Sequence, residues 1–162
     1  MQVKNTVSVS TDFTGGGGTA SVIQTSPVIV RVSPHNEGQA GWSQTWWYIK
    51  IEGFTPGEEI TVQLESDEGK LAGVSPKVFF SYDQNVWGLT DTGEAAIVDG
   101  SELFIYRHQA RANQVWFAYD LPYTPEHVEE ILVPRVEKHP DAERFQLCTT
   151  RNNRTVHAIS IQ

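Results

Sequence analysis

Cysteine is almost absent from this sequence, and so are long hydrophobic runs. One cysteine, Cys148, occurs among 162 residues, which excludes an intramolecular disulfide. The apolar runs are far shorter than the roughly 20 residues that cross a bilayer, so no membrane partner is predicted. No charged-then-apolar leader opens the chain, and we therefore expect a cytoplasmic protein that needs no processing.

Positive charge is also scarce, with 12 Lys and Arg against 20 Asp and Glu and a net charge of −8. No stripe of basic residues carries interleaved aromatic side chains. We therefore do not expect nucleic acid to be a binding partner. The length suits one domain, or one domain and the beginning of another, and is sufficient to bury most of the apolar surface.

The region up to about Tyr119 consists of short β-rich runs separated by Gly, Pro, Asn and Asp. Apolar and polar residues alternate within the runs, as is typical of strands with one buried face. The runs occupy residues 6–10, 20–24, 27–33, 44–53, 59–66, 77–83, 102–107 and 114–120. Together they predict an all-β fold, an antiparallel β-sandwich of two packed sheets.

The run WWYIKI predicts the orientation of one of these strands. Trp47, Ile49 and Ile51 share one face and are expected to point between the two sheets. Trp46 and Tyr48 lie on the opposite face, so one end of this strand should be covered on both sides.

A short helix and a β-hairpin are predicted after the sandwich. Thr124 is a suitable N-cap, followed by Pro125 at the first helical position, and the helix should extend to Leu132 and stop or kink near Val133 because of Pro134. Strands are expected at residues 145–149 and 155–161, around the turn RNNR. The predicted divisions are a sandwich at 1–123, a helix and linker at 124–140, and a hairpin at 141–162.

His127 and Glu130 raise the question of a zinc site, because a helical His at i and a Glu at i+3 share one face. Catalytic zinc needs three protein ligands, and the other histidines show no matching partners in their spacing. These histidines are His35, His108, His139 and His157. The sequence therefore favours a solvated helix face, with no metal ligand and no catalytic residue in this chain.

The aromatic residues and the cysteine each allow two interpretations. The aromatic rings could form a platform for carbohydrate or protein, but their alternation within strands favours packing. This set comprises Trp42, Trp46, Trp47, Tyr48, Trp87, Trp116 and Tyr119. Cys148 lies within a predicted strand, where a small buried apolar side chain is a better interpretation than a nucleophile.

Several blocks of the sequence resemble the cytosolic carboxypeptidases, a group within the M14 zinc metallocarboxypeptidases. WWYIKIEGFTPGEEITVQL and VFFSYDQNVW resemble strands of their N-terminal β-sandwich domain, and VWFAYDLPYT resembles the FAY…PYTY signature that ends it. FQLCTTRNNRTVHAISI resembles the first hairpin of the catalytic domain. Two positions depart from the family pattern. Pro125 stands where the family has the last Tyr of PYTY. Arg154 matches the Arg of the family's Gly-Arg turn in the hairpin, but Asn153 stands in place of its Gly.

The resemblance implies a chain that supports catalysis without performing it. In that family the zinc ligands follow the hairpin, so His127 and Glu130 correspond to none of them, and zinc belongs to the full-length enzyme. The implied partners are a catalytic domain of the same polypeptide and a peptide or protein substrate. Apolar surface should remain exposed near Ile161, and the residues expected at a domain interface, or in a structural role, are Tyr119, Leu121, Pro122, Tyr123, Thr124, Trp47 and Trp87. The alternative is a free-standing binding module that uses surface Trp and Tyr side chains.

Overall fold

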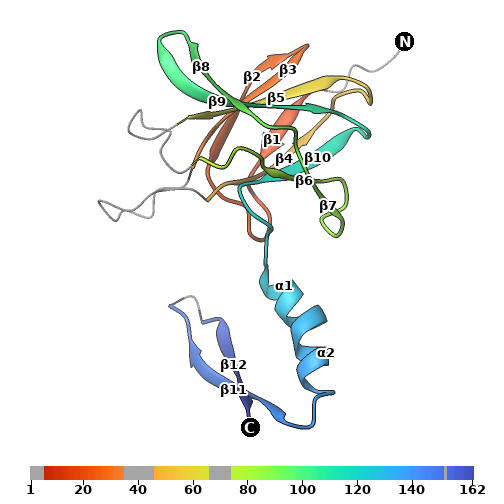
Figure 1. Ribbon diagram of the computed structural model, residues 1–162, viewed down its shortest axis with the longest axis vertical. Helices are drawn as coiled ribbons and strands as arrows, with labels where there is room; N and C mark the ends of the chain where they lie inside the picture. Colours follow the sequence, from red (N-terminus) through yellow and green to blue (C-terminus); the bar gives the residue numbers. More distant parts are fainter. Residues whose placement is uncertain (1–5, 35–45, 66–73, 152) are drawn as a thin grey trace. The chain divides into compact units, whose positions relative to one another are not determined.

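The computed structural model describes residues 6–34, 46–65, 74–151 and 153–162 (Figure 1). The chain forms two compact units, Met1–Pro122 and Tyr123–Gln162. The first is built from strands, and the second from a helical segment and a hairpin. Trp42 and His35 lie outside the described residues.

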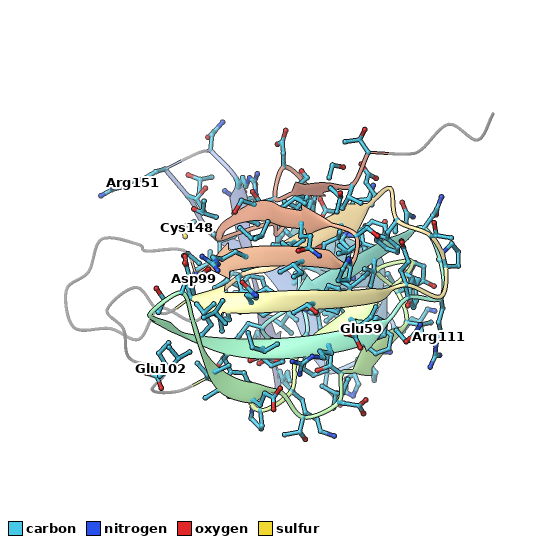
Figure 2. The ribbon with its side chains drawn as sticks, turned by 90° about the horizontal axis from the view of Figure 1, so that it is seen from above. Glu59, Asp99, Glu102, Arg111, Cys148 and Arg151 are labelled. Carbon is cyan, nitrogen blue, oxygen red and sulfur yellow. The ribbon has the colours of Figure 1, made fainter. Side chains whose placement is uncertain are left out.

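Two five-stranded sheets make up the first unit. One sheet has the strand order β1-β4-β10-β6-β7, and its strands are β1 Ser8–Ser10, β4 Tyr48–Glu52, β10 Gln114–Ala118, β6 Phe79–Ser81 and β7 Trp87–Leu89. The other has the order β2-β3-β5-β9-β8, and its strands are β2 Thr19–Thr25, β3 Val28–Ser33, β5 Glu59–Glu65, β9 Ser101–Gln109 and β8 Glu94–Val98. The second sheet faces the viewer in Figure 2, where Glu59 and Arg111 lie at one end of it and Asp99 and Glu102 at the other.

The predicted fold class is confirmed, since the two sheets pack into a sandwich that is followed by a short helical segment and a hairpin. Neighbouring strands are antiparallel except for β3 and β5, which run parallel with Val30 opposite Val62. The sequence did not predict β7 and β8. Both are short edge strands that contribute no residue to the main buried cluster. A strand without a buried face does not need alternating apolar residues, so the sequence carries no clear signal for either.

The core lies between the sheets and follows the alternation of three strands. In β3 and β5 every second side chain is fully or almost fully buried, whereas most of their outward neighbours are partly exposed. Trp47, Ile49 and Ile51 belong to the same buried cluster, which confirms their predicted face. Each fully buried aliphatic side chain of this kind contributes about 1.5–3 kcal/mol through removal from water.

The opposite face of β4 is also covered at one end, as expected. Tyr48 is buried there, with the rings of Phe13 and Trp87 packed edge-on at centroid distances of 4.7 and 5.8 Å. Trp46, on the same face, remains exposed. Burial raises the pKa of the Tyr48 hydroxyl, although a hydrogen bond donated by Gln84 opposes that effect.

The helical segment of the second unit continues past the predicted stop. It consists of α1 Pro125–His127, a π-helical turn η1 Val128–Leu132, and α2 Val133–Val136. The prediction was a stop or a kink near Val133. The helix does not stop there, but its α-helical geometry is interrupted by the wider turn, which bonds the amide of Val133 to the carbonyl of Val128 just before Pro134, a residue with no N–H to donate. Among the described residues, no helix is both long and apolar enough to cross a membrane.

The hairpin pairs β11 Ala142–Thr149 with β12 Thr155–Ile161 in antiparallel register. The second strand has the predicted bounds, whereas the first begins at Ala142 rather than at Phe145. A bulge between Gln146 and Cys148 interrupts the ladder. At the turn, the amide of Thr150 bonds to the carbonyl of Arg154 at 2.8 Å, and Asn153 adopts a positive φ of 57°.

Candidate functional site

The segment that follows β10 ends the first unit with a mixture of buried and exposed side chains. Tyr119 packs against the main core, and its amide donates to the carbonyl oxygen of Trp47 at 3.0 Å. Leu121 is 53% exposed, whereas the next residue, Pro122, is buried. The large apolar side chain of Leu121 is thus available on the surface next to a fixed backbone.

Tyr123 and Thr124 begin the second unit at the start of the helical segment. Tyr123 is 62% exposed, and its ring lies 5.8 Å from the ring of His127. The amide of Thr124 donates to Nδ1 of His127 at 3.1 Å, which satisfies an N–H group at the helix start. The sequence did not predict this use of His127, although a side-chain acceptor three residues after an N-cap is a known signal.

The zinc interpretation of His127 finds no support in this geometry. Nδ1 of His127 is occupied as a hydrogen-bond acceptor, and no group of three or more potential ligands gathers among the described residues. Structural and catalytic zinc sites both require at least three protein ligands. The part of the chain that the structure describes therefore does not fit a zinc ion.

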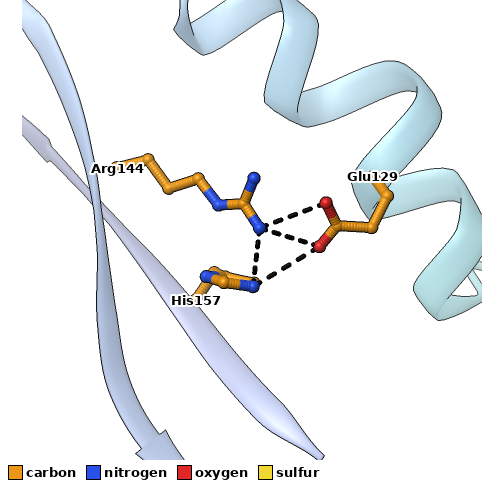
Figure 3. A network of polar contacts seen from close by, with 3 residues as sticks. All are labelled: Glu129, Arg144 and His157. Atoms are coloured by element: carbon orange, nitrogen blue, oxygen red, sulfur yellow. Dashed lines mark hydrogen bonds and ion pairs between the residues drawn. The ribbon is translucent and has the colours of Figure 1, made fainter.

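A polar network holds the helical segment and the hairpin together within the second unit (Figure 3). Nη2 of Arg144 donates to both carboxylate oxygens of Glu129, at 2.9 and 3.1 Å, and to Nε2 of His157 at 2.6 Å. Nε2 of His157 also lies 3.4 Å from Oε1 of Glu129. Exposed ion pairs contribute about 0–1 kcal/mol, so we assign this network a modest structural role.

Apolar side chains are also exposed on the second unit. They are Ile131, Phe145, Leu147, Ile159 and Ile161. Cys148 is exposed as well, so its predicted burial is wrong. The strand pattern indicated a buried position, but nothing in the described part of the chain covers the side chain of Cys148.

The aromatic residues that were considered as a platform serve mainly as packing groups. Trp47 is fully buried in the core, and Trp116 is buried with Tyr48. Trp87 is partly buried and donates from Nε1 to the carbonyl oxygen of Gln84 at 3.0 Å. Among the members of this set that the structure describes, only Trp46 is exposed, so the observed arrangement does not favour a free-standing binding module.

The sandwich corresponds to a domain of a known protein family. The sequence model of the cytosolic carboxypeptidase N-terminal domain matches residues 9–119, from β1 to the end of the sandwich. This chain belongs to that family. No curated protein matches it at a significant level.

Solved metallocarboxypeptidases share the fold of this cytosolic carboxypeptidase N-terminal domain and its continuation. The metallo-carboxypeptidase of Burkholderia cenocepacia is 21% identical, with a TM-score of 0.72 over 96% of this chain and 39% of its own. The metallo-carboxypeptidase of Pseudomonas aeruginosa, in complex with (2-guanidinoethylmercapto)succinic acid, is 25% identical, with a TM-score of 0.67 over 94% and 39% of the two chains. The chain thus spans about two-fifths of the length of these proteins.

The SYD…W block of this cytosolic carboxypeptidase N-terminal domain forms a tight loop between β6 and β7. Oδ1 of Asp83 accepts hydrogen bonds from the amides of Asn85 and Val86, at 2.9 and 2.8 Å, and these bonds lower the pKa of its carboxyl group. Oγ of Ser81 donates to the carbonyl oxygen of Val86 at 2.7 Å. The block is therefore a structural element that closes a hairpin.

Proposed function

We propose that this chain is the non-catalytic N-terminal part of a zinc carboxypeptidase that removes C-terminal residues from peptides or proteins. The single observation that carries the proposal is the family match over residues 9–119. The similarity in fold to metallocarboxypeptidases extends over almost the whole chain and supports it further. The family's description also supports a cytoplasmic location.

In this proposal, the zinc ion is bound by residues that lie outside the present chain. The described residues offer no group of three ligands, so hydrolysis is assigned to a catalytic domain elsewhere in the polypeptide. A zinc ion held by that domain would supply the Lewis-acid chemistry for the hydrolysis. The role of the present chain is to pack beside that domain and to support it.

The proposed boundaries place the sandwich at 1–123, a helix and linker at 124–140, and the first hairpin of the catalytic domain at 141–162. The division of the chain into the units Met1–Pro122 and Tyr123–Gln162 supports a boundary near Tyr123. The exposed side chains of Leu121 and Tyr123 are the proposed interface residues, and Pro122 and Thr124 fix the backbone between and after them. Tyr119, Trp47 and Trp87 support this segment from within the sandwich.

The reading frame beyond Gln162 provides the first test. A continuation that encodes His-x-x-Glu and a later His supports the proposal, whereas a stop codon at that point contradicts it. The second test compares the polypeptide encoded by the whole frame with the 162-residue chain on a peptide substrate. Release of C-terminal residues by the longer protein alone, with loss of activity in a chelator, is the expected result.

A further inference from the structure

One row of apolar side chains crosses the sheet β1-β4-β10-β6-β7 at the point where the chain leaves the sandwich. The register pairs Ala118 of β10 with Tyr48 of β4 and with Phe79 of β6, and it pairs Phe79 with Leu89 of β7. Side chains directly opposite each other in neighbouring strands point to the same face of the sheet. Each of the four is the terminal residue of its strand, and β10 ends here, so we call this set the exit row.

The exit row lies on the outer face of this sheet. Tyr48 alternates along β4 with members of the buried cluster between the two sheets, so its side chain and those of the row point away from that cluster. Tyr48 and Ala118 are covered, in a separate small cluster on the outer face. Phe79 is only partly buried, and Leu89 is 52% exposed. The exit row thus begins under cover and ends in open apolar surface.

The outer face of the other sheet carries charged side chains in place of such a row. Nε and Nη2 of Arg31 donate to Oε1 of Gln63 at 3.2 and 2.9 Å, and Nη1 of Arg31 lies 3.5 Å from Oε1 of Glu65. On the face with the exit row, the ion pair of Lys50 and Glu52 lies toward the far end of β4. Charged residues are depleted in the cores of protein interfaces, so the exit row is the better candidate for a docking surface.

The path of the chain indicates what covers the exit row. Leu121 follows Ala118 by three residues and is also more than half exposed, so apolar surface continues along the segment that leaves the sandwich. The chain spans about two-fifths of the length of metallocarboxypeptidases that share its fold. A further domain joined through this segment is held at a high effective concentration beside the exit row, whereas a separate partner protein is not.

We propose that the exit row is the surface of the sandwich on which the catalytic domain of the same polypeptide docks, an inference that rests on the proposed function. It selects one of the two outer faces of the sandwich, and it adds Phe79 and Leu89 to Leu121 and Tyr123 as interface residues. Docking there removes the open end of the exit row from water, while the covered end provides a rigid base.

The test is the rate at which a maleimide modifies a cysteine introduced at Leu89, in a Cys148→Ser background. Leu89→Cys and the control Ile97→Cys, which lies in the edge strand β8 of the other sheet, are compared in the 162-residue chain and in the polypeptide encoded by the whole reading frame. Mass spectrometry of the peptides identifies the modified position. We expect Leu89→Cys to react at least about tenfold more slowly in the longer protein, and Ile97→Cys to react equally in both. Equal rates for Leu89→Cys in the two proteins would overturn the proposal.

Hydrogen exchange of the unsubstituted proteins provides a second measurement, which does not depend on a change at Leu89. The amides of β6 and β7 should exchange more slowly in the longer protein, and those of β8 should not change. Unchanged exchange in β6 and β7 would contradict the docking.

Carboxypeptidase activity separates this proposal from the proposed function. A longer polypeptide that releases C-terminal residues but leaves Leu89→Cys fully reactive would overturn the docking surface alone. A longer polypeptide without that activity, in which Leu89→Cys reacts slowly, would contradict the proposed function and still show that a following domain covers the exit row. A reading frame that ends at Gln162 would overturn both.

Discussion

The amide of Tyr119 donates to the carbonyl oxygen of Trp47 at 3.0 Å, one residue beyond the end of β10. This bond extends the pairing of β4 with β10 and ties the FAYD block to the WWYIKI block. The chain therefore leaves the sandwich from a fixed position. Leu121, two residues later, is exposed on a short segment whose backbone is held at its origin.

Exposed apolar side chains at this position should bind a hydrophobic dye. We predict that the 162-residue chain binds such a dye or self-associates, and that the double variant Leu121→Ser and Tyr123→Ser reduces this, because both side chains are more than half exposed. Ile97→Ser is the control, since Ile97 is 80% exposed but lies in β8. An equal reduction by Ile97→Ser would argue against a specific surface.

Two glycines with similar backbone angles should respond differently to substitution. Gly53 has a φ of 89°, and a Cβ atom there would lie 2.3 Å from the carbonyl oxygen of Thr6. Gly57 has a φ of 95° but no atom within 4 Å of such a Cβ. Gly57→Ala should lower the free energy of unfolding by about 1 kcal/mol through backbone strain alone, and Gly53→Ala by about 2–4 kcal/mol because of the added clash. Urea unfolding of both variants measures the difference, and equal losses would contradict it.

Trp47 should tolerate a smaller ring better than the loss of the ring. Its side chain is fully buried, but Nε1 has no hydrogen-bond partner among the described residues. Trp47→Ala should cost about 3–5 kcal/mol in the free energy of unfolding. Trp47→Phe should cost clearly less, because removal of an unsatisfied donor offsets part of the lost packing. Thermal or urea unfolding measures both variants, and a loss in Trp47→Phe as large as that in Trp47→Ala would contradict the prediction.

His127 should matter for the start of the helical segment and not for metal binding. We predict no stoichiometric zinc in the dialysed 162-residue chain, and a loss of about 0.5–1 kcal/mol in His127→Ala, since Nδ1 accepts the amide of Thr124. The measurements are metal analysis of the dialysed protein and urea unfolding monitored by the circular dichroism signal of the helix. One tightly held zinc per chain that disappears in His127→Ala would contradict this role.

The sequence predicts the sandwich where alternation is strong. Val28, Val30 and Val32 in β3 alternate with partly exposed residues, and that pattern survives in the structure because one face is buried. The short edge strand β7, WGL, offers no such alternation and was missed. Pro134 predicted a stop or a kink, and the sequence does not reveal that a π-helical turn at Val128–Leu132 precedes it and that the helix continues.

The candidate site was less predictable than the fold. Exposure of Cys148 depends on which layer covers the hairpin, and strand periodicity carries no information on that point. The hydrogen bond between Tyr82 and His108 joins residues 26 positions apart and depends on sheet packing, so no local pattern indicates it. In contrast, Leu121 and Tyr123 could be proposed from the FAYDLPYT block, because the family resemblance identifies the end of the sandwich.

The most direct test of the proposed supporting role is the activity of the polypeptide encoded by the whole reading frame with Tyr123→Ala. We predict a lower kcat/KM for release of C-terminal residues and an unchanged zinc content, because the proposed role of Tyr123 is to support the catalytic domain without contacting the metal. Ile97→Ala, at an even more exposed position in β8, should leave both quantities unchanged. An unaltered kcat/KM in Tyr123→Ala, or a loss of zinc together with activity, would contradict the account.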